Sequence, residues 1–187
     1  MNTRDLVLIA LFAAIVVVLG LIPPITLGFI PVPITAQSMG VMLAGCIIGA
    51  KRGALAFLLF VLLVAIGLPV LSGGRGGLAV FAGPSGGFIL GWAVAAFVTG
   101  LIAERFVHQG NSEARQFVGF FLASVIGGIV VLYAIGVPWL SAVTGTPLTA
   151  AATGALVFIP GDLLKAAIAT LAARAVYAGY PLLPARA

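Results

Sequence analysis

Long apolar runs with very few charged residues are the feature that most limits what this chain can fold into. Of its 187 residues, 63% are hydrophobic and 7% are charged, whereas a soluble domain carries about 25% charged residues. So little polar surface cannot cover a water-facing exterior, which excludes a cytosolic enzyme, a nucleic-acid-binding protein and a disordered chain. The net charge of +5 comes from nine Lys and Arg set against four acids. In a membrane protein such sparse charges indicate topology, not a nucleic-acid partner.

The length of the chain limits the number of membrane crossings. At roughly 20 residues for each spanning helix plus short loops, 187 residues accommodate about six spans. The apolar runs predict an all-α integral membrane protein with a single membrane domain over residues 1–187. Its six transmembrane helices are predicted at residues 6–22, 37–50, 53–71, 88–106, 117–136 and 157–178. The second run covers only about 21 Å of a hydrocarbon layer about 30 Å thick, so it is either partly re-entrant or extended by the segment before it.

The segments between these runs carry turn-forming residues. Four prolines in residues 23–36 exclude a helix there, and glycine dominates residues 72–87, which we expect to form a loop. Residues 137–148 also suggest a loop, whereas residues 149–157 fit either a short helix or the beginning of the last span.

The placement of basic residues predicts the orientation of the bundle, because short cytoplasmic loops carry an excess of Lys and Arg. With the N-terminus inside, all but two of the nine basic residues fall at the cytoplasmic face. The seven residues at the cytoplasmic face are Arg4, Lys51, Arg52, Arg105, Arg115, Arg174 and Arg186. Both termini are therefore predicted to be cytoplasmic. The two exceptions are Arg75, in the outer glycine-rich loop, and Lys165, inside the last helix.

The strongest local signal is FIPGDLLK, residues 158–165. Pro160 suits a first helical position, and Asp162 then falls in the first turn, where the helix dipole favours a carboxylate. Asp162 and Lys165 are three residues apart, share one helix face and can pair. One interpretation is a structural cap with an ion pair near the interface. The other, which we favour, is a ligand cavity, because a capping Asp does not require a lysine inside the membrane.

The glycine-rich loop and the entry to the second span supply further candidates. Apolar residues 78–82 suggest that the loop folds over the mouth of the bundle as a lid, and Arg75 is then placed to meet an anionic ligand group. Gln37 lies where the proline-rich segment enters a helix, so it fits either a cap or a ligand contact. No GxxxxGK[ST] motif and no HExxH motif occurs, so ATP hydrolysis and metalloprotease chemistry are not supported.

Three stretches in order resemble one family, the BioY proteins, which are biotin-specific substrate-capture subunits of energy-coupling-factor (ECF) transporters. The stretches are IPVPITAQSMGVMLAGC (residues 30–46), GLPVLSGGRGGLAVFAGPSGGF (residues 67–88) and FIPGDLLK (residues 158–165). The resemblance implies biotin capture in an outward pocket under loops, with Asp162 and Lys165 contacting the vitamin. It further implies that a shaping turn is formed by Gly83, Pro84, Gly86 and Gly87.

The resemblance also implies location and partners. The protein would lie in the cell membrane, carry no cofactor, and deliver biotin through a transmembrane coupling subunit with two cytoplasmic ATPases. Ala10 and Ala14 on the first helix have the small-xxx-small spacing that would let the coupling subunit approach, and the same spacing fits ordinary packing inside the bundle. Membrane lipid surrounds such a chain, and the sequence leaves open whether it forms a homo-oligomer.

The chemistry of the candidate residues suits biotin. An ionised Asp162 can accept from the ureido N–H groups, Lys165 can donate to the ureido carbonyl, and Arg75 suits the carboxylate. Phe81, Phe88 and Trp92 are candidates to cover the rings, although they fit lipid or core positions equally well.

Two other functions remain open from the sequence. The first is a stand-alone secondary vitamin transporter, either a single chain or an oligomer, that uses Asp162 as the proton-coupling carboxylate. The second is an accessory membrane subunit without a ligand. Uptake by the pure protein in ATP-free liposomes would indicate the first, and saturable small-molecule binding would exclude the second.

Overall fold

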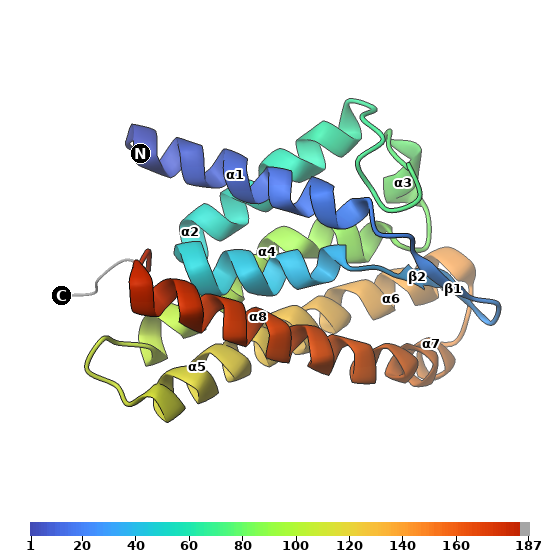
Figure 1. The fold of residues 1–187 in the computed structure, drawn as a ribbon. Coiled ribbons are helices and arrows are strands. Elements are labelled where there is room, and N and C mark those ends of the chain that lie inside the picture. The colour runs from blue at the N-terminus through green and yellow to red at the C-terminus, as the bar shows by residue number, and fades with distance from the viewer. Residues whose placement is uncertain (184–187) are drawn as a thin grey trace.

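The computed structural model describes residues 1–183, and within them the chain forms a bundle of long helices (Figure 1). Arg186, which entered the prediction of orientation, lies outside the described residues. The helices are α1 (Thr3–Gly20), α2 (Gln37–Ala65), α3 (Ala79–Ala82), α4 (Gly86–Phe106), α5 (Glu113–Val125), α6 (Leu132–Thr144), α7 (Leu148–Ala155) and α8 (Ile159–Gly179). A π-helical segment, η1 (Ile126–Val131), joins α5 to α6, and a 3-10 turn, η2 (Leu156–Phe158), joins α7 to α8.

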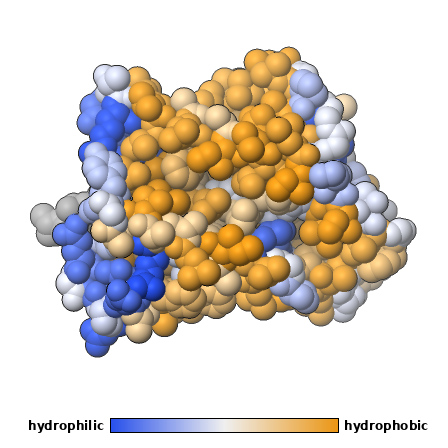
Figure 2. All heavy atoms as spheres, in the orientation of Figure 1, coloured by the Kyte–Doolittle hydropathy of each residue, from blue (hydrophilic) through white to orange (hydrophobic). Residues whose placement is uncertain are grey.

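Five helical stretches are long and apolar enough to cross a membrane. They are Thr3–Gly20, Gln37–Ala65, Gly86–Phe106, Glu113–Thr144 and Leu148–Gly179. Figure 2 shows a broad apolar surface between a hydrophilic end and a second, more mixed end. Because each helix satisfies its own backbone hydrogen bonds, these stretches can lie in hydrocarbon, and the protein is a multi-pass membrane protein.

The predicted second and third spans form one continuous element, α2, which bends sharply at Gly49. Gly49 has φ 83° and ψ −178°, a conformation that is essentially restricted to glycine. The bend brings Gly53 back beside Ala44: a Cβ built on Gly53 would lie 3.3 Å from the Ala44 carbonyl carbon. In a straight helix these residues would be about 13 Å apart along the axis. Element α2 therefore consists of two limbs that meet at a tight reversal.

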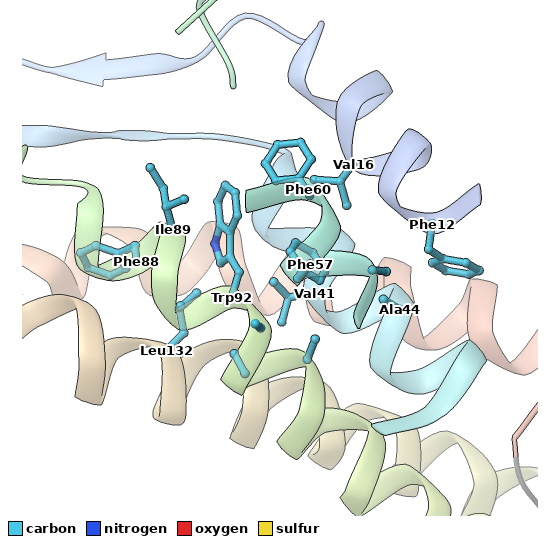
Figure 3. Packing of buried hydrophobic residues seen from close by; sticks show 14 of the residues in the cluster. Phe12, Val16, Val41, Ala44, Phe57, Phe60, Phe88, Ile89, Trp92 and Leu132 are labelled. Atoms are coloured by element: carbon cyan, nitrogen blue, oxygen red, sulfur yellow. The ribbon is translucent and has the colours of Figure 1, made fainter. Parts of the chain in front are cut away.

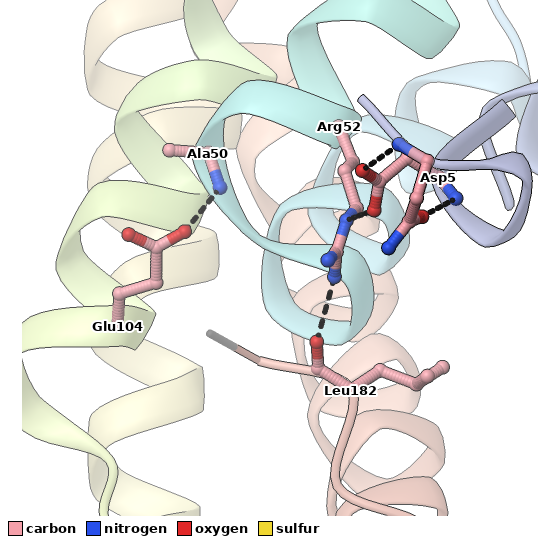
Figure 4. A network of polar contacts seen from close by, with 6 residues as sticks. Asp5, Ala50, Arg52, Glu104 and Leu182 are labelled. Atoms are coloured by element: carbon pink, nitrogen blue, oxygen red, sulfur yellow. Dashed lines mark hydrogen bonds and ion pairs between the residues drawn. The ribbon is translucent and has the colours of Figure 1, made fainter. Parts of the chain in front are cut away.

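Helix α4 packs directly into this reversal. A Cβ on Gly100 would lie 2.2 Å from the backbone nitrogen of Ala50, so only glycine permits this close approach. The Ala50 N–H, which the kink frees from helical bonding, donates to Glu104 Oε1 at 2.7 Å (Figure 4). A side chain from α4 thus satisfies a backbone donor that the bend leaves without a helical partner.

Several predicted boundaries were wrong. Residues 137–148 were expected to form a loop, but α6 continues to Thr144 with Pro138 inside it. A proline within an apolar transmembrane helix is tolerated where neighbouring groups compensate for the missing bond. The third predicted span was extended to residue 71, but its helix ends at Ala65.

The two segments expected to be irregular contain some regular structure. The proline-rich segment forms a small antiparallel hairpin of β1 (Ile25–Leu27) and β2 (Ile30–Ile34), so the expectation of an all-α chain was not fully correct. Proline favours extended backbone, which explains why residues that cannot continue a helix pair as strands here. The glycine-rich segment holds the four-residue helix α3. Residues 149–157 form a short helix and a 3-10 turn before α8.

The core lies between α2 and α4, with α1 and α6 packed against them (Figure 3). Phe57, Phe60 and Trp92 form an aromatic cluster there, with the Trp92 ring centroid 5.9 Å from each phenylalanine ring. The cluster supports the inner side of the pocket described below, because Trp92 belongs to both.

The two ends of the bundle differ. Figure 1 shows the N-terminus and the end of the described chain at one end, and the β1–β2 hairpin, α3 and α7 at the other. At the first end, Arg52 Nε binds Asp5 Oδ1 at 2.7 Å and its Nη1 donates to the Leu182 carbonyl at 3.0 Å (Figure 4). These bonds join the first helix, the α2 bend and the segment after α8. The hairpin end, by contrast, contains a pocket.

Candidate functional site

A small cavity of about 60 Å³ lies at the hairpin end of the bundle. The β2 segment, the glycine-rich loop and five helical elements all contribute to its wall. The lining residues are Val32, Pro33, Ile34, Thr35, Gln37, Ser38, Leu71, Arg75, Ser85, Phe88, Ile89, Trp92, Leu132, Tyr133, Phe158, Asp162 and Lys165. The wall therefore combines apolar and aromatic side chains with polar and charged groups that converge on one space, as small-molecule sites do.

The predicted pair of Asp162 and Lys165 is formed and lies in this wall. Lys165 Nζ is 2.8 Å from Asp162 Oδ1, and the two side chains are only 14% and 8% exposed. Pro160 stands at the beginning of α8 and Asp162 in its first turn, as the sequence predicted. The ammonium group also donates to Ser38 Oγ at 3.0 Å. Two opposite charges thus compensate each other in a position where a lone charge is costly.

Tyr133 completes the polar cluster and was not predicted. Its hydroxyl donates to Asp162 Oδ2 at 2.6 Å, so each carboxylate oxygen has one partner. Tyr133 comes two residues after the π-helical segment η1, where an extra residue changes the direction of the following side chains. A glycine pair in η1 permits close packing: a Cβ on Gly127 would lie 2.0 Å from Thr99 Oγ1, and one on Gly128 would lie 2.6 Å from Met42 Cε. The Gly-Gly pair inside a predicted span was the only sequence signal for this feature.

Arg75 reaches the pocket from the glycine-rich loop. Gly73 and Gly74, with φ of 79° and 70°, turn the chain back so that Leu71 and Arg75 pair as an isolated antiparallel bridge. Arg75 Nε donates to the Ser72 carbonyl at 3.2 Å and Nη1 donates to Ser85 Oγ at 3.3 Å. Among residues 1–183, no carboxylate forms a salt bridge with it. The pocket therefore contains one guanidinium whose charge the described chain leaves uncompensated.

Gln37 lines the pocket, but its amide is occupied by the protein. Its Nε2 donates to the carbonyl oxygens of Val16 and Val70, each at 3.0 Å, and its Oε1 accepts from the Ser72 N–H at 2.9 Å. The side chain is 1% exposed, and α2 has no side-chain N-cap. Gln37 therefore connects α1, α2 and the glycine-rich loop that carries Arg75, which is called the Arg75 loop below. The helix cap considered for Gln37 is absent.

The three aromatic candidates occupy different places. Trp92 and Phe88 line the pocket, and Phe88 packs edge-on against Tyr133 with ring centroids 6.2 Å apart. Phe81 is half-buried on α3 and packs against the core without lining the cavity.

The predicted turn beyond α3 also lies outside the pocket wall. The Gly83 carbonyl accepts from Trp139 Nε1 at 3.1 Å. A Cβ on Gly86 would lie 2.0 Å from the Phe81 carbonyl oxygen, and one on Gly87 would lie 2.2 Å from Trp139 Cβ. The two glycines thus allow the beginning of α4 to pack against α3 and α6. Pro84, between Gly83 and Gly86, is half-buried.

The small residues predicted to face a partner lie on the surface of α1. Ala10 and Ala14 are both exposed, whereas the buried face of α1 is formed by Ile9, Phe12, Ala13 and Val16. Ordinary packing inside the bundle therefore does not explain their spacing. As for metal sites, the described residues contain no group of three or more His, Cys, Asp or Glu side chains that could hold an ion.

Comparisons with known proteins agree with this architecture. The model of the BioY family matches residues 1–182. The biotin transporter BioY of Rhizobium etli is 65% identical over 187 residues, which is 100% of both chains. The biotin transporter BioY of Rhodobacter capsulatus is 50% identical over 182 residues, covering 92% of this chain and 93% of that protein.

A solved structure is also similar. The crystal structure of the S-component for biotin from an ECF-type ABC transporter has a TM-score of 0.86 and 35% identity, and the match covers 95% of each chain. Family, sequence and structure thus agree over nearly the whole chain. This protein belongs to the BioY family.

Proposed function

We propose that this protein is the biotin-binding substrate-specificity subunit of an ECF-type vitamin transporter, which captures biotin from the extracytoplasmic side. The observation that carries the proposal is the charge arrangement of the pocket at the hairpin end. Asp162 and Lys165 neutralise each other, and Arg75 adds one positive charge without a carboxylate partner among the described residues. A ligand with one negative charge would make the site neutral, which burial favours.

The remaining hydrogen-bonding capacity suits a ureido ring and a carboxylate. Each Asp162 oxygen has one protein partner and can accept another bond, so the ureido N–H groups can bind there. Lys165 uses two of its N–H groups on Asp162 and Ser38, which leaves the third for the ureido carbonyl. Arg75 lies in the loop and would receive the valerate carboxylate. Trp92 and Phe88 would cover the apolar ring.

Entry of the vitamin requires the wall of the pocket to move. A cavity of about 60 Å³ is far smaller than the roughly 300–1,000 Å³ of ordinary ligand pockets. The β1–β2 hairpin and the glycine-rich loop that carries Arg75 close the hairpin end, and Gln37 and Ser85 hold that loop to α2 and to the beginning of α4. We therefore infer that these two loops open to admit biotin and close over it.

We further propose that the chain crosses the membrane six times, with both termini cytoplasmic. The two limbs of α2 on either side of Gly49 would cross separately, over about 18 Å and about 24 Å. Support for the orientation comes from the basic residues Lys51, Arg52 and Arg105. Lys51 and Arg52 follow the bend at Gly49, where Arg52 pairs with Asp5 near the N-terminus (Figure 4). Arg105 lies in the last turn of α4. This arrangement follows the positive-inside rule.

ATP-driven transport would need partners, because the sequence contains no ATP-binding motif of the P-loop type. We propose a transmembrane coupling subunit with two cytoplasmic ATPases, and no cofactor in this chain itself. The exposed pair Ala10 and Ala14 on α1 supports close approach of a partner helix at that face.

Isothermal titration of the purified protein with biotin, thiamine and riboflavin tests the proposal. We expect saturable binding of biotin alone, and a sharp loss of affinity in Asp162→Asn. Asp5→Asn is a matched control, because it removes the same charge from an ion pair at the opposite end and should bind biotin normally. Unchanged biotin affinity in Asp162→Asn would contradict the assigned role of Asp162. Uptake by the pure protein in ATP-free liposomes, abolished by collapsing a pH gradient, would instead support the secondary-transporter function.

A further inference from the structure

A groove of about 640 Å³ lies between the end of α4 and the length of α5 up to Ile126, and it begins at the end of the bundle opposite the Asp162 pocket. The loop that joins the two helices borders it. Its lining residues are Ile102, Arg105, Phe106, His108, Asn111, Ala114, Arg115, Val118, Gly119, Leu122 and Ile126. None of them takes part in the pocket described above, so the groove requires a separate explanation.

One end of the groove is positively charged. Arg105 and Arg115 line it from the two helices, both are exposed, and neither forms a salt bridge within residues 1–183. The nearby acid on α5, Glu113, pairs with Arg174 of α8 instead. His108 and Asn111 at the same end are directed to backbone carbonyls, with the His108 ring 3.0 Å from the Arg105 carbonyl oxygen. The two guanidinium groups are therefore available to an anion.

The rest of the groove is apolar and opens onto the surface that faces lipid. Val118, Leu122 and Ile126 repeat every four residues along one side of α5 and its extension, so they form one stripe. They are 53%, 49% and 38% exposed. From Arg115 to Ile126 the helix rises about 16 Å, which matches the roughly 15 Å of one hydrocarbon leaflet. The charged end of the groove thus continues into an apolar wall, and the length of that wall matches the depth to which an acyl chain extends in one leaflet.

We propose that this groove binds one anionic phospholipid, with the phosphate between Arg105 and Arg115 and an acyl chain along Val118, Leu122 and Ile126. A small phosphate ion would need only the two arginines and would make no use of the apolar wall. A zwitterionic phospholipid fits the wall, but its headgroup brings no net negative charge to the two cations. The site is independent of biotin binding, since no residue is shared between the groove and the pocket.

Native mass spectrometry of the full chain in detergent, with added phosphatidylglycerol or phosphatidylcholine, tests the proposal. We expect one retained phosphatidylglycerol per chain and much weaker retention of phosphatidylcholine. The double variant Arg105→Gln and Arg115→Gln should retain phosphatidylglycerol about ten- to thirtyfold less, given the contribution of a basic residue at an anionic membrane surface. The double variant Arg4→Gln and Lys51→Gln removes the same charge outside the groove and should bind normally.

A second variant separates a lipid from a free anion. Leu122→Trp keeps both arginines and fills the apolar wall, so it should lower retention of phosphatidylglycerol while the thermal unfolding temperature stays near that of the wild type. If the groove double variant and the control double variant lost phosphatidylglycerol retention equally, the attraction would be non-specific and the proposal would be overturned. Full competition by soluble glycerol phosphate would show an anion site without a lipid chain. Normal lipid retention in the groove variants, combined with loss of co-purifying coupling subunit or of a second copy of the chain, would identify a protein contact instead.

Discussion

The contacts of Asp162 and Lys165 predict that removing one charge will be far more harmful than removing both. In Asp162→Asn the Lys165 ammonium group loses its carboxylate partner and keeps the hydroxyl of Ser38. In Lys165→Met the Asp162 carboxylate loses the ammonium group and keeps the hydroxyl of Tyr133. A lone charge inside a membrane helix costs about 2.5–3.5 kcal/mol, and breaking a buried ion pair costs about 3–5 kcal/mol. Because a hydroxyl partner remains in each case, we expect each single variant to lose about 2–3 kcal/mol of unfolding free energy.

The double variant Asp162→Asn and Lys165→Met should be much more stable than the sum of the two singles. It carries no charge on either side chain, so its free energy of unfolding should fall by only about 1 kcal/mol, close to the value of one weakened hydrogen bond. The coupling energy between the two substitutions should then be about 3–5 kcal/mol. Unfolding in mixed detergent micelles measures these energies, and isothermal titration with biotin provides the second readout. We expect weak biotin binding in all three variants. Additive stability losses would refute the ion pair as a stabilising element, and restored biotin affinity in the double variant would refute its role in binding.

Three further variants test other parts of the structure. Arg75→Gln should lower biotin affinity about tenfold or more while leaving the affinity for uncharged biotinamide unchanged, because only the carboxylate needs the guanidinium; equal losses for both ligands in calorimetry would contradict this. Tyr133→Phe removes the hydroxyl that donates to Asp162 and should reduce biotin affinity about tenfold, again by calorimetry, with far-UV circular dichroism unchanged. Gly49→Ala forces a Cβ onto a backbone with φ 83° and should lose about 1–3 kcal/mol of unfolding free energy, whereas Gly179→Ala, with open space around it, should lose almost none.

The parts of the site that the sequence revealed are those in which a charge stands out against an apolar run. Asp162 and Lys165 are three residues apart on one helix, so their pairing depends on local geometry alone. Arg75 was equally visible, because an unexplained cation in a glycine-rich outer loop has few structural roles. Tyr133 and Gln37 were different. Tyr133 is 29 residues from Asp162 and Gln37 is 35 residues from Ser72, and nothing in the sequence alone fixes which distant backbone or carboxyl group each one meets.

The fold was predicted best where turn chemistry interrupts the apolar pattern. The prolines of residues 23–36 and the glycines of residues 72–87 correctly marked non-spanning segments, although neither pattern indicated the hairpin or α3. The same reasoning failed at Pro138, where a proline lies within a continuing helix. Turn residues mark segments whose backbone can hydrogen-bond to water. In hydrocarbon no water is available, so unpaired backbone groups are costly and the helix continues through a proline that would often end it in a soluble protein.

The charges at the hairpin end also argue for one class of vitamin over others. With Asp162 and Lys165 paired, the pocket carries the single positive charge of Arg75, whichever side chain contacts which part of the ligand. A cationic vitamin such as thiamine would double that charge in a partly buried site, and a neutral one such as riboflavin would leave it uncompensated after the loops close. A monoanion of biotin's size removes it. Discrimination between biotin and these vitamins would then arise from the free-energy cost of enclosing an unneutralised charge. That cost would oppose closure of the hairpin and the Arg75 loop over the wrong vitamin.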